Sequence, residues 1–314
     1  MRPTFSFSLA TVLLACLLPG LTAVPAGALA ESDPSSGTVR VTGATLRYVI
    51  EGKGRPCLVV GSSVYYPRIL SNTLRQHLRL IFLDLRHFVP SEPSLEPSLV
   101  TLDTYAADIE TTRRQLGLGA VLVMGHSIHG NIALEYARRY PTTTSGVIVI
   151  GSPPVGVRKM GEAAKQFWET DASDQRKQLL QKNWEGARPR LEALSPSDRF
   201  IREYVLNGPK YWYNPAYDAS AMWKGMEVNM AIVGQLFGVL FAEYDLAQSP
   251  SSLKAPVFLA LGRYDYVVPY TLWDSERSKL PRLSYNLFER SGHTPQVEEA
   301  VNFDATLLKW LAQK

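Results

Sequence analysis

The amino-acid sequence predicts an α/β fold, in which a doubly wound, mostly parallel β-sheet carries an inserted helical cap. Short, continuously apolar runs alternate with helical segments over most of the chain, as expected for central strands covered on both faces. One long stretch, residues 155–250, breaks this alternation with a helical pattern rich in aromatic residues. It lies between two apolar runs with the pattern of strands, so we expect an insertion that covers the carboxyl edge of the sheet.

The first 30 residues have the pattern of a secretory signal peptide. Arg2 precedes an apolar core at Leu9–Leu18, and Ala28–Ala30 is a cleavage site of the A-x-A type. The core is short and is followed by Pro19-Gly20, so no stable membrane span is predicted. We therefore expect an exported protein, either periplasmic or secreted.

A second interpretation of this segment is a lipoprotein signal. Leu13-Leu14-Ala15-Cys16 resembles a bacterial lipobox, in which Cys16 would become a lipid-anchored N-terminus. The residues after Cys16 stay apolar as far as Ala30, which is unusual for a mature lipoprotein and favours cleavage after Ala30.

Seven stretches of the mature chain have the pattern of strands. Thr38–Ile50 alternates apolar and polar residues, and the other six are short apolar runs. In chain order these runs are Cys57–Gly61, Leu80–Leu83, Val121–Met124, Val147–Ile150, Val257–Leu261 and Leu283–Phe288.

Helical segments separate several of these runs. Asp103–Leu116 and Val297–Leu311 have one apolar side, and Asn131–Tyr140 ends before Pro141. The predicted division is therefore residues 31–154 for the first part of the core, 155–250 for the cap and 251–314 for the second part of the core.

Composition excludes several classes of function. The chain of 314 residues carries a net charge of only +4, which is too weak and too scattered for nucleic-acid binding. Cys57 is the single cysteine after Ala30, in an apolar run typical of a buried core thiol, so no intramolecular disulfide is expected. Neither a metal-ligand spacing nor a glycine-rich phosphate loop is present, and we expect no metal and no cofactor.

Ser127 is the candidate nucleophile. It lies in Gly125-His-Ser-Ile-His-Gly130, where the apolar strand Val121–Met124 runs directly into a turn and a helix follows. A serine at such a tight strand–helix turn is held above the sheet edge in a strained conformation. The amide of Ile128, at the start of the helix, can donate to an oxyanion.

His293 and Asp265 are the candidates that complete a catalytic triad. Each follows a predicted strand near the end of the chain, so both are expected at the carboxyl edge of the sheet beside Ser127. The histidine can take the serine proton, and the aspartate can fix its tautomer and stabilise its charged form. The chain order Ser, Asp, His matches that expected when such a triad is built on this fold.

These motifs resemble the α/β-hydrolase fold superfamily over about residues 38–314. The resemblance is carried by Gly-His-Ser127-Ile-His-Gly, Gly-Arg-Tyr-Asp265-Tyr-Val-Val-Pro and Ser-Gly-His293-Thr-Pro-Gln, in that order. A fourth stretch, Asp84–Ser91, is similar to the family's Asp-x-Arg-Gly-x-Gly-x-Ser turn. The cap and overall layout are weakly similar to proline-iminopeptidase-like and esterase-like members.

Two departures from the family pattern bear on the site. Gly61-Ser62-Ser63 stands where members usually have His-Gly-x, so the Ser62 amide is expected to be the second oxyanion donor. His129 replaces the second glycine of Gly-x-Ser-x-Gly, where a side chain crowds the contact between helix and strand. His129 is interpreted as a structural variant or a second titrating group near the site, and His87 as a residue that could face the pocket.

The resulting prediction is a hydrolase that cleaves a small-molecule ester or amide through an acyl-enzyme. Three alternatives stay open. A proline-iminopeptidase-like aminopeptidase would need a cap carboxylate for the substrate amine, with Glu203, Glu227, Glu243 and Asp245 as candidates. A lyase or cofactor-free peroxidase would keep the triad, and a non-catalytic protein would bind a small molecule without turnover. A dehalogenase is disfavoured, because that chemistry needs an aspartate where Ser127 stands.

Overall fold

The computed structural model of the protein describes residues 35–92, 95–248 and 253–313. The predicted signal peptide, its cleavage site and Cys16 lie outside these residues, so export and lipidation stay predictions. No helix within the described ranges has both the length and the apolar character needed to cross a bilayer.

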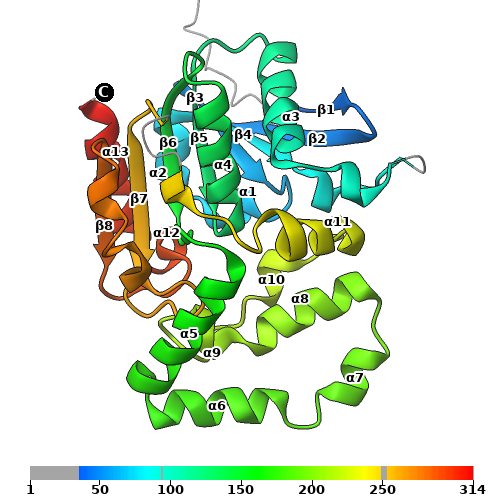
Figure 1. Cartoon of the computed structure of the whole chain (residues 1–314), viewed down its shortest axis with the longest axis vertical. Coiled ribbons are helices and arrows are strands. Elements are labelled where there is room, and N and C mark those ends of the chain that lie inside the picture. Colours follow the sequence, from blue (N-terminus) through cyan, green and yellow to red (C-terminus); the bar gives the residue numbers. More distant parts are fainter. Residues whose placement is uncertain (1–34, 93–94, 249–252, 314) are drawn as a thin grey trace, which may run out of the picture. The chain divides into compact units, whose positions relative to one another are not determined.

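The eight strands of the described chain form one sheet in the order β1-β2-β4-β3-β5-β6-β7-β8 (Figure 1). Strand β2 pairs antiparallel with β1 and β4, and the other neighbours are parallel. Their bounds are β1 Ser35–Val41, β2 Ala44–Glu51, β3 Arg55–Gly61, β4 Leu78–Asp84, β5 Val121–His126, β6 Thr144–Ile150, β7 Val257–Gly262 and β8 Leu283–Phe288. The predicted doubly wound, mostly parallel sheet is confirmed.

Helices cover both faces of the sheet because residues of the central strands alternate between two apolar clusters. Leu58, Val60 and Val123 face helices α3 (Leu102–Gln115) and α4 (Ile128–Arg139). Cys57, Val59 and Met124 belong to the opposite cluster, with side chains of α1, α2 and α13. Helix α1 spans Tyr66–Ile69, α2 spans Asn72–His77 and α13 spans Ala300–Ala312.

Two of the predicted elements are interrupted in the structure. Thr38–Ile50 is a hairpin rather than one strand, and it turns at Gly43, whose φ of 76° suits glycine. The predicted helix Val297–Leu311 is divided into α12 (Pro295–Glu298) and α13 by Glu299, whose ψ of 47° is not helical. The Glu299 carboxylate accepts hydrogen bonds from Arg290 N and Ser291 Oγ, at 2.8 Å each, which compensates for the break.

The cap consists of the helices between β6 and β7, drawn green to yellow in Figure 1. Buried Arg176 links its parts, because its guanidinium donates to the carbonyls of Pro209, Trp212 and Tyr213 at 2.7–2.8 Å. The helices are α5 Val157–Asp171, α6 Asp174–Trp184, α7 Arg188–Glu192, α8 Pro196–Leu206, α9 Gly208–Tyr211, α10 Ser220–Trp223, α11 Met230–Gln235 and a π-helical turn, Leu236–Leu240.

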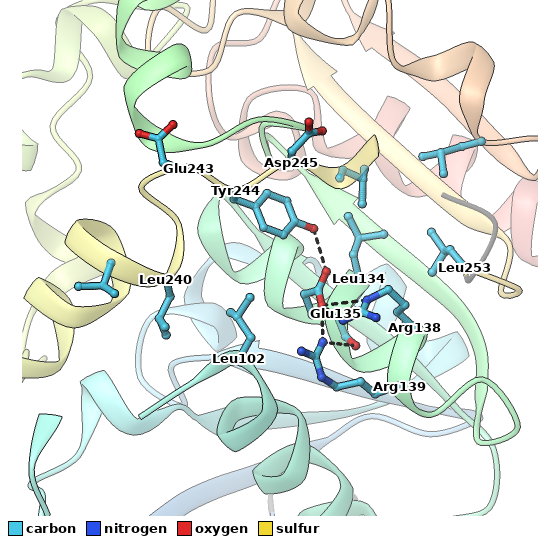
Figure 2. A pocket seen from close by; sticks show the side chains of 13 residues that line it. Leu102, Leu134, Glu135, Arg138, Arg139, Leu240, Glu243, Tyr244, Asp245 and Leu253 are labelled. Atoms are coloured by element: carbon cyan, nitrogen blue, oxygen red, sulfur yellow. Dashed lines mark hydrogen bonds and ion pairs between the residues drawn. The ribbon is translucent and has the colours of Figure 1, made fainter. Parts of the chain in front are cut away.

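A hollow of about 330 Å³ opens beside α4 and residues 239–246 (Figure 2). Its central carboxylate, Glu135, accepts hydrogen bonds from Arg138, Arg139 and the Tyr244 hydroxyl. The residues that line the hollow include neither Ser127 nor a histidine. It is therefore not the candidate active site.

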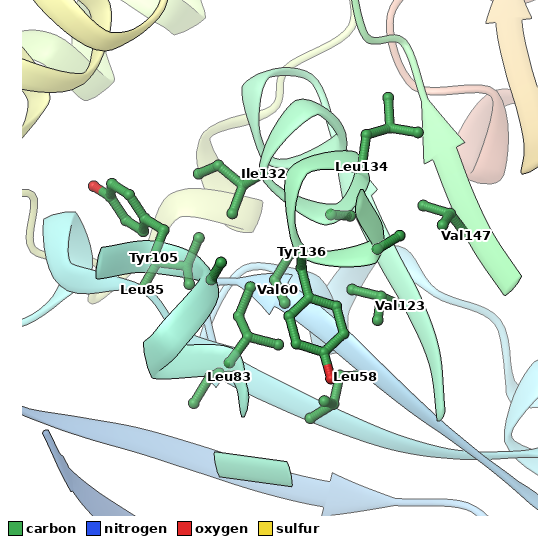
Figure 3. Close-up of a cluster of buried hydrophobic side chains, with 14 of the residues drawn as sticks. Leu58, Val60, Leu83, Leu85, Tyr105, Val123, Ile132, Leu134, Tyr136 and Val147 are labelled. Atoms are coloured by element: carbon green, nitrogen blue, oxygen red, sulfur yellow. The ribbon is translucent and has the colours of Figure 1, made fainter. Parts of the chain in front are cut away.

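The core beneath α3 and α4 fixes the position of the turn that precedes α4. Tyr105, Ile132 and Tyr136 from the two helices pack on Leu58 and Val123 of the sheet (Figure 3). All five are essentially inaccessible to solvent, with exposed fractions of 1% or less. The start of α4 thus rests on a closely packed layer, which limits its movement.

Candidate active site

Ser127 occupies the turn between β5 and α4 with φ 57° and ψ −133°. Among the described residues it is the one non-glycine residue with positive φ, a conformation that costs about 1–3 kcal/mol. Two hydrogen bonds hold it there: Ser127 N donates to Ile150 O at 2.7 Å, and Ser152 Oγ donates to Ser127 O at 2.6 Å. A backbone group of Ile150 and the side chain of Ser152 therefore hold the predicted strained turn.

Glycine at position 125 lets the helix approach the strand. A Cβ added to Gly125 would lie 2.2 Å from His129 O and 2.5 Å from Gly130 N, closer than any side chain tolerates. Gly61 plays a similar part for the His129 ring, since a Cβ there would lie 3.0 Å from His129 Nδ1. The crowding expected from His129 is thus relieved by neighbouring glycines.

His293 and Asp265 meet at the carboxyl edge of the sheet, after β8 and β7. Asp265 Oδ2 lies 2.6 Å from His293 Nδ1, and both side chains are at most 2% exposed. Asp265 Oδ1 accepts from the amides of Val267 and Val268 at 2.9 and 2.8 Å. This arrangement favours a proton on Nδ1, which leaves Nε2 of His293 free as a base.

A cavity of about 610 Å³ contains both Ser127 and His293. Apolar side chains of the core and cap make most of its wall, among them Phe200, Phe237 and Phe241. Of the described residues that line it, none is Asp, Glu, Lys or Arg. The cavity is therefore suited to an uncharged, largely apolar molecule.

Two residues of the cavity lining, Ile128 and Ser62, carry the backbone amides predicted to bind an oxyanion. Ile128 begins α4, so its N–H has no acceptor within the helix. Ser62 follows the end of β3 and lines the same cavity. Its loop is held by Asp84, whose Oδ1 accepts from Ser63 N at 2.5 Å, while Ser62 Oγ accepts from Val64 N and Tyr65 N at 3.1 Å.

His87 and His129 form a hydrogen-bonded pair in the cavity wall. Their Nε2 atoms lie 2.8 Å apart, so one ring donates and the other accepts. His129 Nδ1 is 2.7 Å from the Tyr66 hydroxyl, and His87 Nδ1 is 3.1 Å from the Tyr105 hydroxyl. Every ring nitrogen of the pair is thereby occupied, and burial lowers the pKa of both histidines, that of His87 to about 3. The structure thus places both predicted residues at the cavity as a neutral network that joins four elements of the core.

We expect the buried histidines His87 and His126 to make the stability of the fold sensitive to acid. In the unfolded chain a histidine takes up its proton near pH 6.5, whereas burial lowers the folded-state pKa of His87 and of His126 to about 3. The unfolded state therefore binds more protons as the pH falls below 6.5, and stability is lost towards pH 3. Each residue should cost about 2–3 kcal/mol by about pH 4.5.

Urea unfolding at pH 7 and at pH 4.5 measures this loss. His87→Gln should lose less stability between the two pH values than the wild type. His77→Gln, which changes an exposed histidine, should match the wild type. Equal losses in all three proteins would contradict the assignment.

The sequence did not predict two sets of hydrogen bonds, made by His126 and Glu298, that hold His293 in place. His126 Nε2 donates to His293 O at 2.8 Å. Glu298 accepts from the amides of Gly292 and Thr294, on either side of His293, and from Tyr213 N in the cap. Burial raises the pKa of Glu298 to about 7, while these amides act to lower it. The only feature of the sequence that could have suggested this role is the short separation of Glu298 from His293 along the chain.

The acidic residues of the cap that were candidates for binding a substrate amine do not line the large cavity, whereas several aromatic residues of the cap do. Glu203, Glu227, Glu243 and Asp245 all lie outside the lining of the large cavity. Glu243 and Asp245 instead border the hollow beside α4. Six of the aromatic residues of the cap region do line the cavity: Phe200, Tyr204, Tyr211, Trp223, Phe237 and Phe241.

Comparison with known proteins gives one family. A family model described as alpha/beta hydrolase fold matches residues 59–300. The AB hydrolase superfamily protein YclE of Bacillus subtilis is 37% identical over 279 residues, which cover 88% of this chain and 99% of that protein. A proline iminopeptidase of Heyndrickxia coagulans is 23% identical over 289 residues, 87% of this chain and 97% of the relative.

A solved structure agrees with this assignment at the level of the fold. The proline iminopeptidase of Mycobacterium smegmatis superposes with a TM-score of 0.66 at 17% identity, and the match covers 89% of this chain and 98% of that one. Identity this low supports the shared architecture alone.

Proposed function

Because this chain belongs to the α/β-hydrolase fold family, we propose that it is a serine hydrolase that cleaves neutral, largely apolar esters of small molecules. Ser127 is the nucleophile, His293 the general base and acid, and Asp265 the residue that orients His293. The observation that carries the proposal is the strained Ser127 in one uncharged cavity with His293, whose Nδ1 is bound to Asp265. Export of the mature chain belongs to the proposal, and an intact mass lacking residues 1–30 would support it.

The mechanism follows from these positions. Nε2 of His293 takes the proton of Ser127 Oγ as the oxygen attacks the ester carbonyl. Negative charge develops on the carbonyl oxygen, where the amides of Ser62 and Ile128 stabilise it, an effect worth about 10²–10³ in rate for one donor. His293 then protonates the leaving alcohol. Water attacks the acyl group on Ser127 with His293 again as base, which releases the acid and restores the enzyme.

The cavity argues against the aminopeptidase alternative despite the related proline iminopeptidases. An aminopeptidase must hold the ammonium group of its substrate, and a buried charge without a partner costs several kcal/mol. The described lining offers no carboxylate, and Glu203, Glu227, Glu243 and Asp245 are all elsewhere. An ester without charge meets no such penalty.

Parallel assays of two substrates test the proposal. The wild type and Ser127→Ala are given 4-nitrophenyl esters of short apolar acids and, separately, proline 4-nitroanilide. We expect ester turnover to exceed amide turnover and to depend on Ser127. Equal or faster release from the prolyl amide would favour the aminopeptidase. Turnover of neither substrate would favour the lyase, peroxidase or binding-protein alternatives.

A further inference from the structure

The cap segment 210–213, at the end of α9, lies against both loops that carry the candidate base and its carboxylate partner. His293 N donates to Tyr211 O at 2.6 Å, and the two rings are 5.4 Å apart. In the loop after β7, the residue that follows the triad aspartate is Tyr266, whose N donates to Lys210 O at 3.0 Å. The cap is thus connected by backbone hydrogen bonds to the two loops that complete the candidate triad.

Glu298 of α12 adds a connection that is made by a side chain. Its Oε1 accepts from Tyr213 N in the cap at 2.6 Å. Its Oε2 accepts from Gly292 N at 2.9 Å and from Thr294 N at 3.3 Å, on either side of His293. One carboxylate therefore uses its two oxygens to join the cap to the loop of the candidate base. Glu298 is outside the described lining of the cavity, so it can affect the reaction only through its neighbours.

These contacts suit an ionised carboxylate. All three partners are backbone N–H groups, which donate and cannot accept. An ionised carboxylate accepts on both oxygens, whereas a protonated carboxyl group carries a hydrogen on one of them. Protonation of Glu298 therefore places a donor opposite an N–H group. It should weaken either the contact with the cap or the contact with the histidine loop.

The charged and titratable groups around Glu298 come from several elements. Burial has the largest effect and raises the pKa of Glu298 to about 7, while the three amides act to lower it. Asp265, in the loop after β7, also raises this pKa, whereas the guanidinium of Arg176 in α6 favours the ionised form. Tyr65 and Tyr217 interact with Glu298 as well, but burial raises the pKa of both phenols, so they stay neutral near pH 7. Both forms of Glu298 are therefore populated near neutral pH.

We propose that Glu298 is a positioning residue that links the cap to His293, and that its ionised form holds the candidate base in the productive position. The inference rests on the proposed hydrolase function and deepens it, because it adds a residue through which the cap acts on the base. The cap segment 210–213 is then part of the support of the base as well as part of the cover over the cavity.

Glu298→Gln tests the proposal, because glutamine has the size of the protonated side chain and one acceptor oxygen. Hydrolysis of 4-nitrophenyl butyrate is measured between pH 5.5 and pH 9. At pH 9 the variant should have a kcat about tenfold below wild type at unchanged KM, because a small displacement of the base is enough for such a loss. At pH 5.5 the two proteins should agree within about twofold, because Glu298 is then protonated in the wild type. Glu289→Gln, which changes an exposed carboxylate after β8, is the matched control and should follow the wild type at every pH.

Amide hydrogen exchange separates this inference from the proposed function. Mass spectrometry follows exchange at pH 8 in the peptides that contain Tyr213 and residues 292–294. Because glutamine has one acceptor oxygen, exchange should be faster in at least one of these peptides in Glu298→Gln and unchanged in Glu289→Gln. This result supports the link between the cap and the histidine loop even if the wild type hydrolyses none of the esters.

The wild type provides a measurement that does not depend on the folding of a variant. Protection is the ratio of the intrinsic to the observed exchange rate. In the same two peptides, compared with a peptide from β5, it should fall between pH 8 and pH 5.5 as Glu298 becomes protonated. The inference is overturned if neither Glu298→Gln nor the change of pH affects exchange in these peptides. It is also overturned if Glu298→Gln has the wild-type kcat, or a deficit that is the same at every pH, even if ester turnover depends on Ser127.

Discussion

Replacement of Ser127 by alanine is expected to reduce ester turnover about 10⁴-fold or more, with little change in KM. The variant keeps the cavity and the His293–Asp265 pair but lacks the oxygen that forms the acyl-enzyme. Because the strained turn is held by backbone groups of Ser127 and Ile150 and by Ser152, alanine should adopt the same conformation. Steady-state hydrolysis of a 4-nitrophenyl ester measures the effect.

The control for this variant is Ser278→Ala. Ser278 lies exposed on a short 3-10 helix, Arg277–Lys279, outside the cavity lining. It should retain wild-type turnover. Ser127→Ala activity within tenfold of wild type would exclude Ser127 as the nucleophile.

Asp265→Asn is expected to reduce kcat about 10⁴-fold while the fold is kept. The asparagine oxygen can still accept from the amides of Val267 and Val268, which turns its NH₂ group toward His293 Nδ1. Nδ1 must then accept, so the proton moves to Nε2 and the base proposed to deprotonate Ser127 is lost.

Asp304→Asn is the control for Asp265→Asn, because it makes the same exchange at another buried carboxylate. Asp304 accepts a hydrogen bond from Ser71 and is outside the cavity lining, so its replacement should leave kcat close to wild type. Circular dichroism should show the wild-type spectrum for both variants. If the two variants lost activity equally, Asp265 would have no particular role in orienting His293.

The sheet and the positions of the candidate triad were predictable because they depend on local patterns. Apolar runs such as Val121–Met124 indicate buried parallel strands. The residues that follow such strands share one edge of the sheet, which brings Ser127 and His293 into one cavity despite their separation along the chain. The inserted helical pattern was visible for a similar reason, since it interrupts a regular alternation.

Other parts of the site depend on tertiary contacts that no local pattern encodes. The hydrogen-bond partners of His129 are Tyr66 of α1 and His87 of the 3-10 helix Arg86–Phe88, which are far from it in the sequence. The break between α12 and α13 accompanies hydrogen bonds that Glu298 accepts from Tyr213 in the cap and that Glu299 accepts from Arg290 in the loop after β8, whereas propensity favours one continuous helix. The contact of the Tyr65 ring with Trp223 of the cap likewise requires knowledge of how the cap folds.

The most direct test of Ser127 as the nucleophile is labelling with methyl 4-nitrophenyl hexylphosphonate, an uncharged analogue of an apolar ester. Attack of Ser127 Oγ on phosphorus should form a stable Ser127–phosphonate bond and release one equivalent of 4-nitrophenolate, while His293 accepts the serine proton. We expect peptide mass spectrometry to place the phosphonyl group on Ser127, ester turnover to be lost in proportion to labelling, and Asp265→Asn to react much more slowly. A label on another residue, or full ester turnover by the labelled protein, would contradict it.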